Sequence, residues 1–115
     1  MPPREWNFRI EDMLECVEKI RRYTKDMDVE AFKQSNITID AVLRNIEILG
    51  EAAHHVPDSV AALAPEIPWR QIRGMRNILA HQYFGADVDT VWNTITVNIP
   101  PLIEPLQRLL RSRET

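Results

Sequence analysis

Apolar residues recur at intervals of three and four along most of this 115-residue chain. Such spacing places apolar side chains on one face of an α-helix. No segment alternates apolar and polar residues, as a half-buried strand would. The chain is therefore predicted to be all-α. Its first helix is predicted from Asn7 to about Lys25, with an inward stripe of Ile10, Met13, Leu14, Val17 and Ile20.

Capping residues predict where the next two helices begin. Asp28 is placed to cap a short helix over residues 29–34, because a carboxylate can accept a hydrogen bond from a free backbone N–H. A long helix is then predicted to open at Thr38 or Asp40 and to run to about His55. Its inward stripe consists of Ile39, Val42, Leu43, Ile46, Leu49, Ala53 and Val56.

Prolines divide the second half of the chain. Three of them, at positions 57, 65 and 68, bracket a connection with at most one helical turn. Pro68 suits the first position of the following helix, which is predicted to end near Gly85. The last helix is predicted from Val88 towards Arg111, kinked near Pro100. Residues 1–115 are thus expected to form one domain, an antiparallel bundle of four to five main helices.

Composition narrows the possible environments. The single Cys16 cannot form an internal disulfide, and no apolar run approaches the ~20 residues that span a bilayer. We therefore expect a cytoplasmic protein without a membrane segment. The formal net charge of -3 does not favour nucleic-acid binding in general. An RNA site would have to be a local basic patch, and a DNA ligand is not expected.

The candidate functional residues lie close together, in the run from Arg76 to Tyr83. Arg76 is a permanent cation that can hold a phosphate with two hydrogen bonds, and His81 can exchange a proton near neutral pH. Arg70 and Arg73 precede Arg76 at intervals of three and extend its positive charge along one flank. On an ideal helix His81 lies about 140° from Arg76. The helix is therefore predicted to end near His81, within the segment 82–87.

These groups suffice in outline for RNA cleavage without a metal ion or other cofactor. The 2'-hydroxyl is the nucleophile, His81 moves its proton, and Arg76 stabilises the charge that develops on the phosphate oxygens. A second acid or base is still required. A two-fold dimer would supply it by bringing together two copies of Arg76 and His81.

Structural roles compete with this interpretation. Taken singly, Arg76 is typical of a surface ion pair, His81 of a helix end, and Tyr83 of a core ring with a satisfied hydroxyl. His54 and His55 suggest a metal site, but no third ligand is evident nearby, so solvated helix-end residues are the preferred interpretation. The polar ridge of the long helix, which includes Arg44, Asn45, Glu47 and Glu51, is open to two interpretations. It either lines the same cleft as Arg76 and His81 or forms an ion-pair network.

The run Arg76-x4-His81-x-Tyr83 resembles the motif of the HEPN superfamily, most closely its HepT branch. That branch is the toxin half of MNT–HEPN toxin–antitoxin pairs. The surrounding residues agree with this resemblance: Trp69, Asn77, Val91-Trp92 and the segment Gly50-Glu51-Ala52.

The resemblance implies a homodimeric, metal-independent endoribonuclease toxin of a type VII-like system. Arg76 and His81 would be catalytic, with Asn77 as a supporting residue. Apart from the resemblance, Glu47 on the polar ridge and Arg73 on the basic flank are further candidates for supporting residues. Tyr83 matches the tyrosine to which a partner nucleotidyltransferase, the MNT-type antitoxin, transfers AMP. The expected partners are thus RNA, the antitoxin and a second copy of the chain. The alternatives are a non-catalytic HEPN-type module that binds nucleotide or partners a nucleotidyltransferase, and a helical interaction protein without a site.

Overall fold

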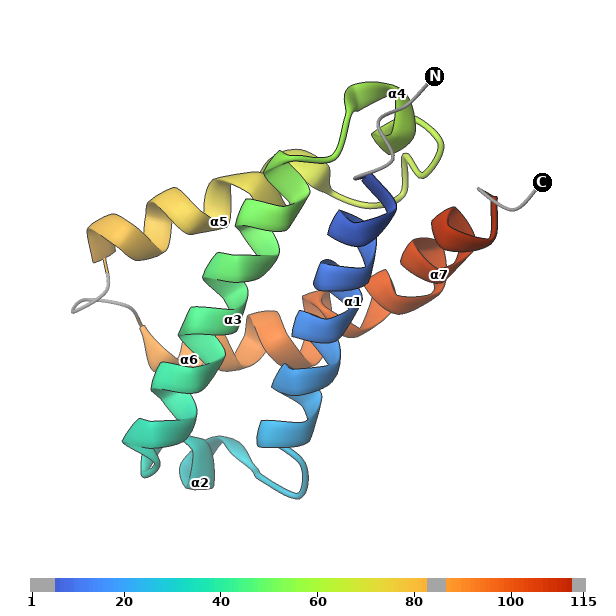
Figure 1. The fold of residues 1–115 in the computed structure, drawn as a ribbon. Helices are drawn as coiled ribbons and strands as arrows, with labels where there is room; N and C mark the ends of the chain where they lie inside the picture. Colours follow the sequence, from blue (N-terminus) through green and yellow to red (C-terminus); the bar gives the residue numbers. More distant parts are fainter. Residues whose placement is uncertain (1–5, 83–86, 113–115) are drawn as a thin grey trace.

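The computed structural model describes residues 6–82 and 87–112, without the side chains of residues 76–82. Within these ranges every regular element is helical, which confirms the predicted fold class (Figure 1). No helix there is long and apolar enough to cross a membrane. The elements in order are α1 (Trp6–Tyr23), α2 (Val29–Lys33), α3 (Asn36–His54), α4 (Asp58–Ala61), α5 (Trp69–Gln82), α6 (Val88–Asn93), the π-helical turn η1 (Thr94–Asn98), the 3-10 turn η2 (Pro100–Leu102) and α7 (Ile103–Ser112).

The long helices α1 and α3 lie side by side and run in opposite directions (Figure 1). Helix α3 also packs against α5, and α1 packs against α7. Buried side chains from all of these helices form one apolar core. The innermost members include Ile10, Met13, Leu49, Ile72 and Leu106, each no more than 1% exposed. The apolar stripes read from the sequence therefore face a common interior.

One of the two predicted helix starts is confirmed and the other is wrong. The Asp28 carboxylate accepts a hydrogen bond from the backbone N–H of Ala31 at 2.8 Å. Helix α3, however, begins at Asn36, earlier than the predicted Thr38 or Asp40. Ser35 is its cap, because its hydroxyl accepts from the N–H of Thr38 and lies 2.7 Å from the Thr38 hydroxyl. A serine three residues before a threonine can cap a helix as well as break one.

The predicted kink near Pro100 is confirmed, and it takes up nine residues. The N–H of Ile99 bonds to the carbonyl of Thr94, five residues back, which widens the turn into a π-helix. The 3-10 turn at Pro100 follows at once. Pro100 and Pro101 have no N–H to offer the carbonyls four residues before them. The chain therefore bends and enters α7 in a new direction.

Candidate active site

Helix α5 carries the candidate catalytic positions. The backbone at Arg76, Asn77 and His81 is α-helical, and α5 is described as far as Gln82, directly after His81. Residues 83–86 lie outside the described part of the chain, so the predicted end of this helix stays a prediction. The side chains of these residues, and Tyr83 as a whole, lie outside the described part of the chain. Five residues of α-helix separate two positions by about 7.5 Å along the axis and about 140° around it. Arg76 and His81 therefore occupy different faces of one helix.

Arg73 anchors the first half of α5 to the end of α3. Its Nε donates to the carbonyl of Ala53 and its Nη2 to the carbonyl of Val56, both at 2.9 Å. Nη1 reaches a carboxylate oxygen of Asp58 at 3.4 Å, and the guanidinium carbon lies 5.6 Å from the centre of the Trp69 ring. These bonds satisfy carbonyls at a helix end that have no partner within the helix. Arg73 is therefore largely engaged within the protein, whereas Arg70 is exposed.

Trp69 fixes the first residue of α5. The helix begins at Trp69, one residue later than the predicted start at Pro68. The Trp69 side chain is buried, and its indole N–H donates to the carbonyl of Ala64 at 3.0 Å. Pro68 precedes the helix and contributes its carbonyl to the N–H of Ile72. The Trp69 ring and the Arg73 guanidinium thus fix the start of α5.

The chain after the candidate site is anchored to α2. Asp87 caps α6, since its carboxylate accepts from the N–H of Asp89 at 3.0 Å and from the hydroxyl of Thr90 at 3.1 Å. Lys33 forms an ion pair with Asp89 at 3.0 Å, and the rings of Phe32 and Trp92 lie 5.1 Å apart. Described contacts therefore hold the helices on both sides of residues 83–86.

The polar ridge of α3 divides into different environments. Asn45 is buried and donates to the carbonyl of Ala41 in its own helix at 2.9 Å. Arg44 and Glu47 are exposed. A carboxylate oxygen of Glu51 lies 3.0 Å from Nε2 of His55, within reach of a hydrogen bond or an ion pair. Part of the ridge is thus structural, and the supporting role predicted for Glu47 stays a prediction.

Two further groups could carry chemistry: the histidines at positions 54 and 55, which suggest a metal site, and the thiol of Cys16. The described residues hold no cluster of three or more His, Cys, Asp or Glu side chains placed to bind a metal ion. Cys16 is 3% exposed. Burial raises the pKa of the Cys16 thiol to about 11, which keeps it protonated near neutral pH. A thiol in this state is a poor nucleophile.

The sequence did not single out the cations at the end of α1. Arg21, Arg22 and Lys25 suit the end of a helix, because the helix dipole favours cations near a C-terminus. The structure places them beside a hollow between α1 and α7. A signal was available in the sequence, because three cations occur within five residues. The sequence does not show, however, that α7 packs opposite these cations.

Comparison with known proteins identifies a family. The family model described as "Ribonuclease HepT-like" matches residues 13–109. The provisionally named RNase MJ0125 of Methanocaldococcus jannaschii is 36% identical over 99% of this chain and 98% of its own. A ribonuclease HepT, likewise provisionally named, from Thermococcus cleftensis is 40% identical over 87% of this chain and 91% of its own. No solved structure matches the chain.

Proposed function

The chain belongs to the HepT-like ribonuclease family, and from this membership we propose that it is an endoribonuclease of the HEPN type. The observation that carries the proposal is the family match over residues 13–109, which includes the whole of α5. The relatives named as ribonucleases match nearly their full length, so the proposal concerns the entire chain. RNA is the substrate class.

The proposed reaction uses Arg76 and His81 without a metal ion. His81 accepts the proton of a 2'-hydroxyl while the 2'-oxygen forms a bond to the adjacent phosphorus. The bond from phosphorus to the 5'-oxygen breaks, and the leaving oxygen takes a proton from a second acid. Arg76 stabilises the charge on the phosphate oxygens. The products are a 2',3'-cyclic phosphate and a 5'-hydroxyl.

A homodimer supplies the second acid in this proposal. The two positions lie about 140° apart on one helix, so a single copy places them on different faces. Two copies of α5 that meet around a two-fold axis can pair the Arg76 of one with the His81 of the other. Asn77 and Glu47 are proposed to orient these groups. Arg73 supports them from a distance, through its bonds to the end of α3.

Control of the enzyme is proposed to act through Tyr83. A partner nucleotidyltransferase of the MNT type would form a bond between the Tyr83 oxygen and the α-phosphorus of ATP, and pyrophosphate would leave. Tyr83 directly follows the last residue of α5. A phosphate ester there would add negative charge beside the site and repel the phosphates of RNA. The pair would then act as a toxin and its antitoxin in the cytoplasm.

Expression of the chain alone in a bacterial host tests the activity. The unaltered chain is expected to slow growth and fragment RNA. Arg76→Ala is expected to lower cleavage by about 10²–10³-fold, as loss of a charge-stabilising donor does. His81→Ala is expected to lower it by about 10²–10⁴-fold, as loss of a general base does. Growth curves and cleavage rates of the purified proteins, measured with and without EDTA, give the readout.

Arg111→Ala, an exposed arginine on α7 outside this basic flank, is the matched control for these variants. Equal growth and intact RNA for all versions would overturn the ribonuclease proposal and favour a non-catalytic module. Co-expression with a nucleotidyltransferase from the same genome tests the control step in the same host. With the unaltered chain, we expect growth to recover and AMP to be attached to the protein. With Tyr83→Phe, we expect neither recovery nor attached AMP. AMP on the Phe variant would show that another residue is the target.

A further inference from the structure

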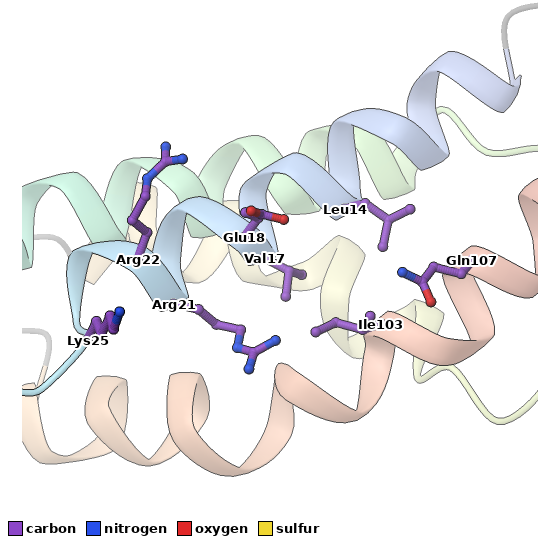
Figure 2. A pocket seen from close by; sticks show the side chains of 8 residues that line it. All are labelled: Leu14, Val17, Glu18, Arg21, Arg22, Lys25, Ile103 and Gln107. Carbon is purple, nitrogen blue, oxygen red and sulfur yellow. The ribbon is translucent and has the colours of Figure 1, made fainter.

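A groove lies between α1 and α7, apart from helix α5. It has a volume of about 710 Å³ (Figure 2). Helix α3 packs against both α1 and α5. The groove borders α1, and α3 lies between α1 and α5, the helix that carries Arg76 and His81. The groove is therefore a second feature of the surface, which the proposed catalytic residues do not explain.

Cations dominate the rim of this groove. Arg21 and Lys25 lie four residues apart on α1 and so share a face of that helix. Arg21 extends from α1 across the groove towards α7, whereas the Arg22 side chain points away from α7 (Figure 2). All three are exposed, and within the described part of the chain no ion pair joins them to an acid. Glu18 also lines the groove, so its described lining has a net positive charge.

The floor of the groove is small and apolar. Leu14 and Val17 of α1 and Ile103 of α7 form it, and the amide of Gln107 stands beside them. An amide carries both donors and an acceptor. The helix dipole accounts for cations at the end of α1. It does not account for an open hollow beside unpaired cations in a protein of net charge -3.

We infer that this groove binds the backbone of single-stranded RNA at a distance from the cleavage site, an inference that rests on the proposed function. Arg21 and Lys25 would contact successive phosphates. A base would lie on the apolar floor or on a guanidinium plane, and Gln107 would meet a base edge or a 2'-hydroxyl. The strongest contribution would come from the phosphates, as in sequence-independent RNA binding.

RNA fits the groove better than an acidic protein segment does. A stable protein interface buries about 800 Å² on each partner and has an apolar centre. Three apolar side chains make a small apolar centre. Among the described residues, the most exposed large apolar side chains are Ile37 and Leu63, and neither lines the groove. Hydrated cations on a flexible rim suit a polyanion whose charges repeat at short intervals.

The molecule's size makes the length of the RNA a test. Its extents are 47 × 29 × 20 Å. A stacked strand advances about 3.4 Å per nucleotide, so a tetranucleotide spans only about 14 Å. A strand of about twenty nucleotides is longer than the molecule. A short RNA can therefore occupy the site on α5 alone, whereas a long one can reach the groove as well.

Binding is measured with the double variant Arg21→Gln/Lys25→Gln in a His81→Ala background, which prevents cleavage. Fluorescence anisotropy of a labelled twenty-nucleotide oligouridylate gives Kd between about 50 and 200 mM KCl. We expect Kd to rise about tenfold and the slope of log Kd against log salt to fall by about 1.4, or 0.7 for each lost phosphate contact. The tetranucleotide cannot span both sites, so its Kd is expected to rise less than that of the long strand.

The matched control is Lys33→Gln/Arg111→Gln, which removes the same charge from cations that already pair with Asp89 and Glu104. It is expected to leave Kd within about twofold of the parent. Circular dichroism checks that all variants fold. Equal losses in both double variants would mean that net charge alone acts, and would overturn the inference. Polyglutamate that competes with RNA at equal charge concentration would also overturn it, in favour of an acidic protein partner.

The catalytic assay separates the two proposals. Cleavage of long RNA with a raised KM and an unchanged kcat in the groove variant is the expected result. If the chain cleaves RNA and the groove variant binds and cleaves as well as the parent, the groove inference fails while the function stands. If no version cleaves RNA but the groove variant still loses RNA affinity, the function fails while the groove binds RNA.

Discussion

At the scale of single residues, one guanidinium joins three segments of the chain. Arg73 bonds to carbonyls of Ala53 and Val56, reaches Asp58 and lies over the ring of Trp69. Two of its partners are backbone carbonyls, one in the last turn of α3 and one just beyond that helix. The planar fork of arginine matches this pair of acceptors, and a lysine ammonium would not.

Arg73→Lys is therefore expected to lower the free energy of unfolding by about 2 kcal/mol, because two hydrogen bonds from a charged donor are lost. Urea unfolding followed by circular dichroism measures this. Exposed Arg70→Lys on the same helix is the control, with an expected change under about 0.5 kcal/mol. Equal stability of the two variants would show that the Arg73 bonds contribute nothing net.

At the scale of elements, α5 contains a glycine without a structural reason in the single chain. A Cβ added at Gly74 would meet nothing within 4 Å among the described residues. Glycine inside a helix lowers stability relative to alanine, because the unfolded chain has more freedom to lose.

Gly74→Ala is expected to raise the free energy of unfolding by about 0.5–1 kcal/mol. The measurement is again urea unfolding, carried out at several protein concentrations. A fall in stability that deepens with concentration would mean that a second copy lies over Gly74. That outcome would contradict an open surface at this position and would explain the glycine as a site of close approach.

The elements were predicted from sequence with uneven success, for physical reasons. Caps at Asp28 and Asp87 depend on the side chain and the next three residues, so local sequence identifies them. The cap at Ser35 was missed because Ser and Asn favour both turns and helix starts. The break at Pro100 was predicted from missing N–H groups, but the π-helical turn before it was not. A wide turn depends on how α6 and α7 pack, which periodicity does not contain.

At the scale of the whole molecule, a pair of charged side chains joins distant parts of the sequence. Arg108 on α7 donates to Glu66 in the connection between α4 and α5. The pKa of the Glu66 carboxyl is lowered, first by a backbone hydrogen bond at Glu66 and then by Arg108. A lowered folded pKa stabilises the protein above the unfolded value near 4.5, and this contribution is lost as the pH falls through the folded pKa.

Glu66→Gln is accordingly expected to lower Tm slightly at pH 7, where the carboxylate is charged. Both groups are exposed, so the effect is small and decreases with added salt. The difference from the parent should vanish in strong acid, well below pH 4.5. Thermal unfolding between pH 2 and pH 7 checks this, with exposed Glu11→Gln as the control. A difference that persists at pH 2 would exclude the carboxylate charge as its cause.

The site was less accessible to prediction than the fold. The place of Arg76 and His81 on one helix followed from the spacing of apolar residues around them. The engagement of Arg73 did not, because its acceptors are twenty and seventeen residues away in sequence. The groove beside Arg21 and Lys25 was likewise invisible, since it requires α1 and α7 to meet. Sequence thus predicts what lies within a helix better than what lies between two.

The burial of Cys16 has a practical consequence for studies of how copies of the chain meet. With a pKa of about 11 and 3% exposure, this thiol is shielded from maleimide reagents while the protein stays folded. A cysteine introduced on the surface can therefore carry a dye or a spin label without first removing the native one. Distances between labels on two copies then become measurable in an otherwise unaltered protein.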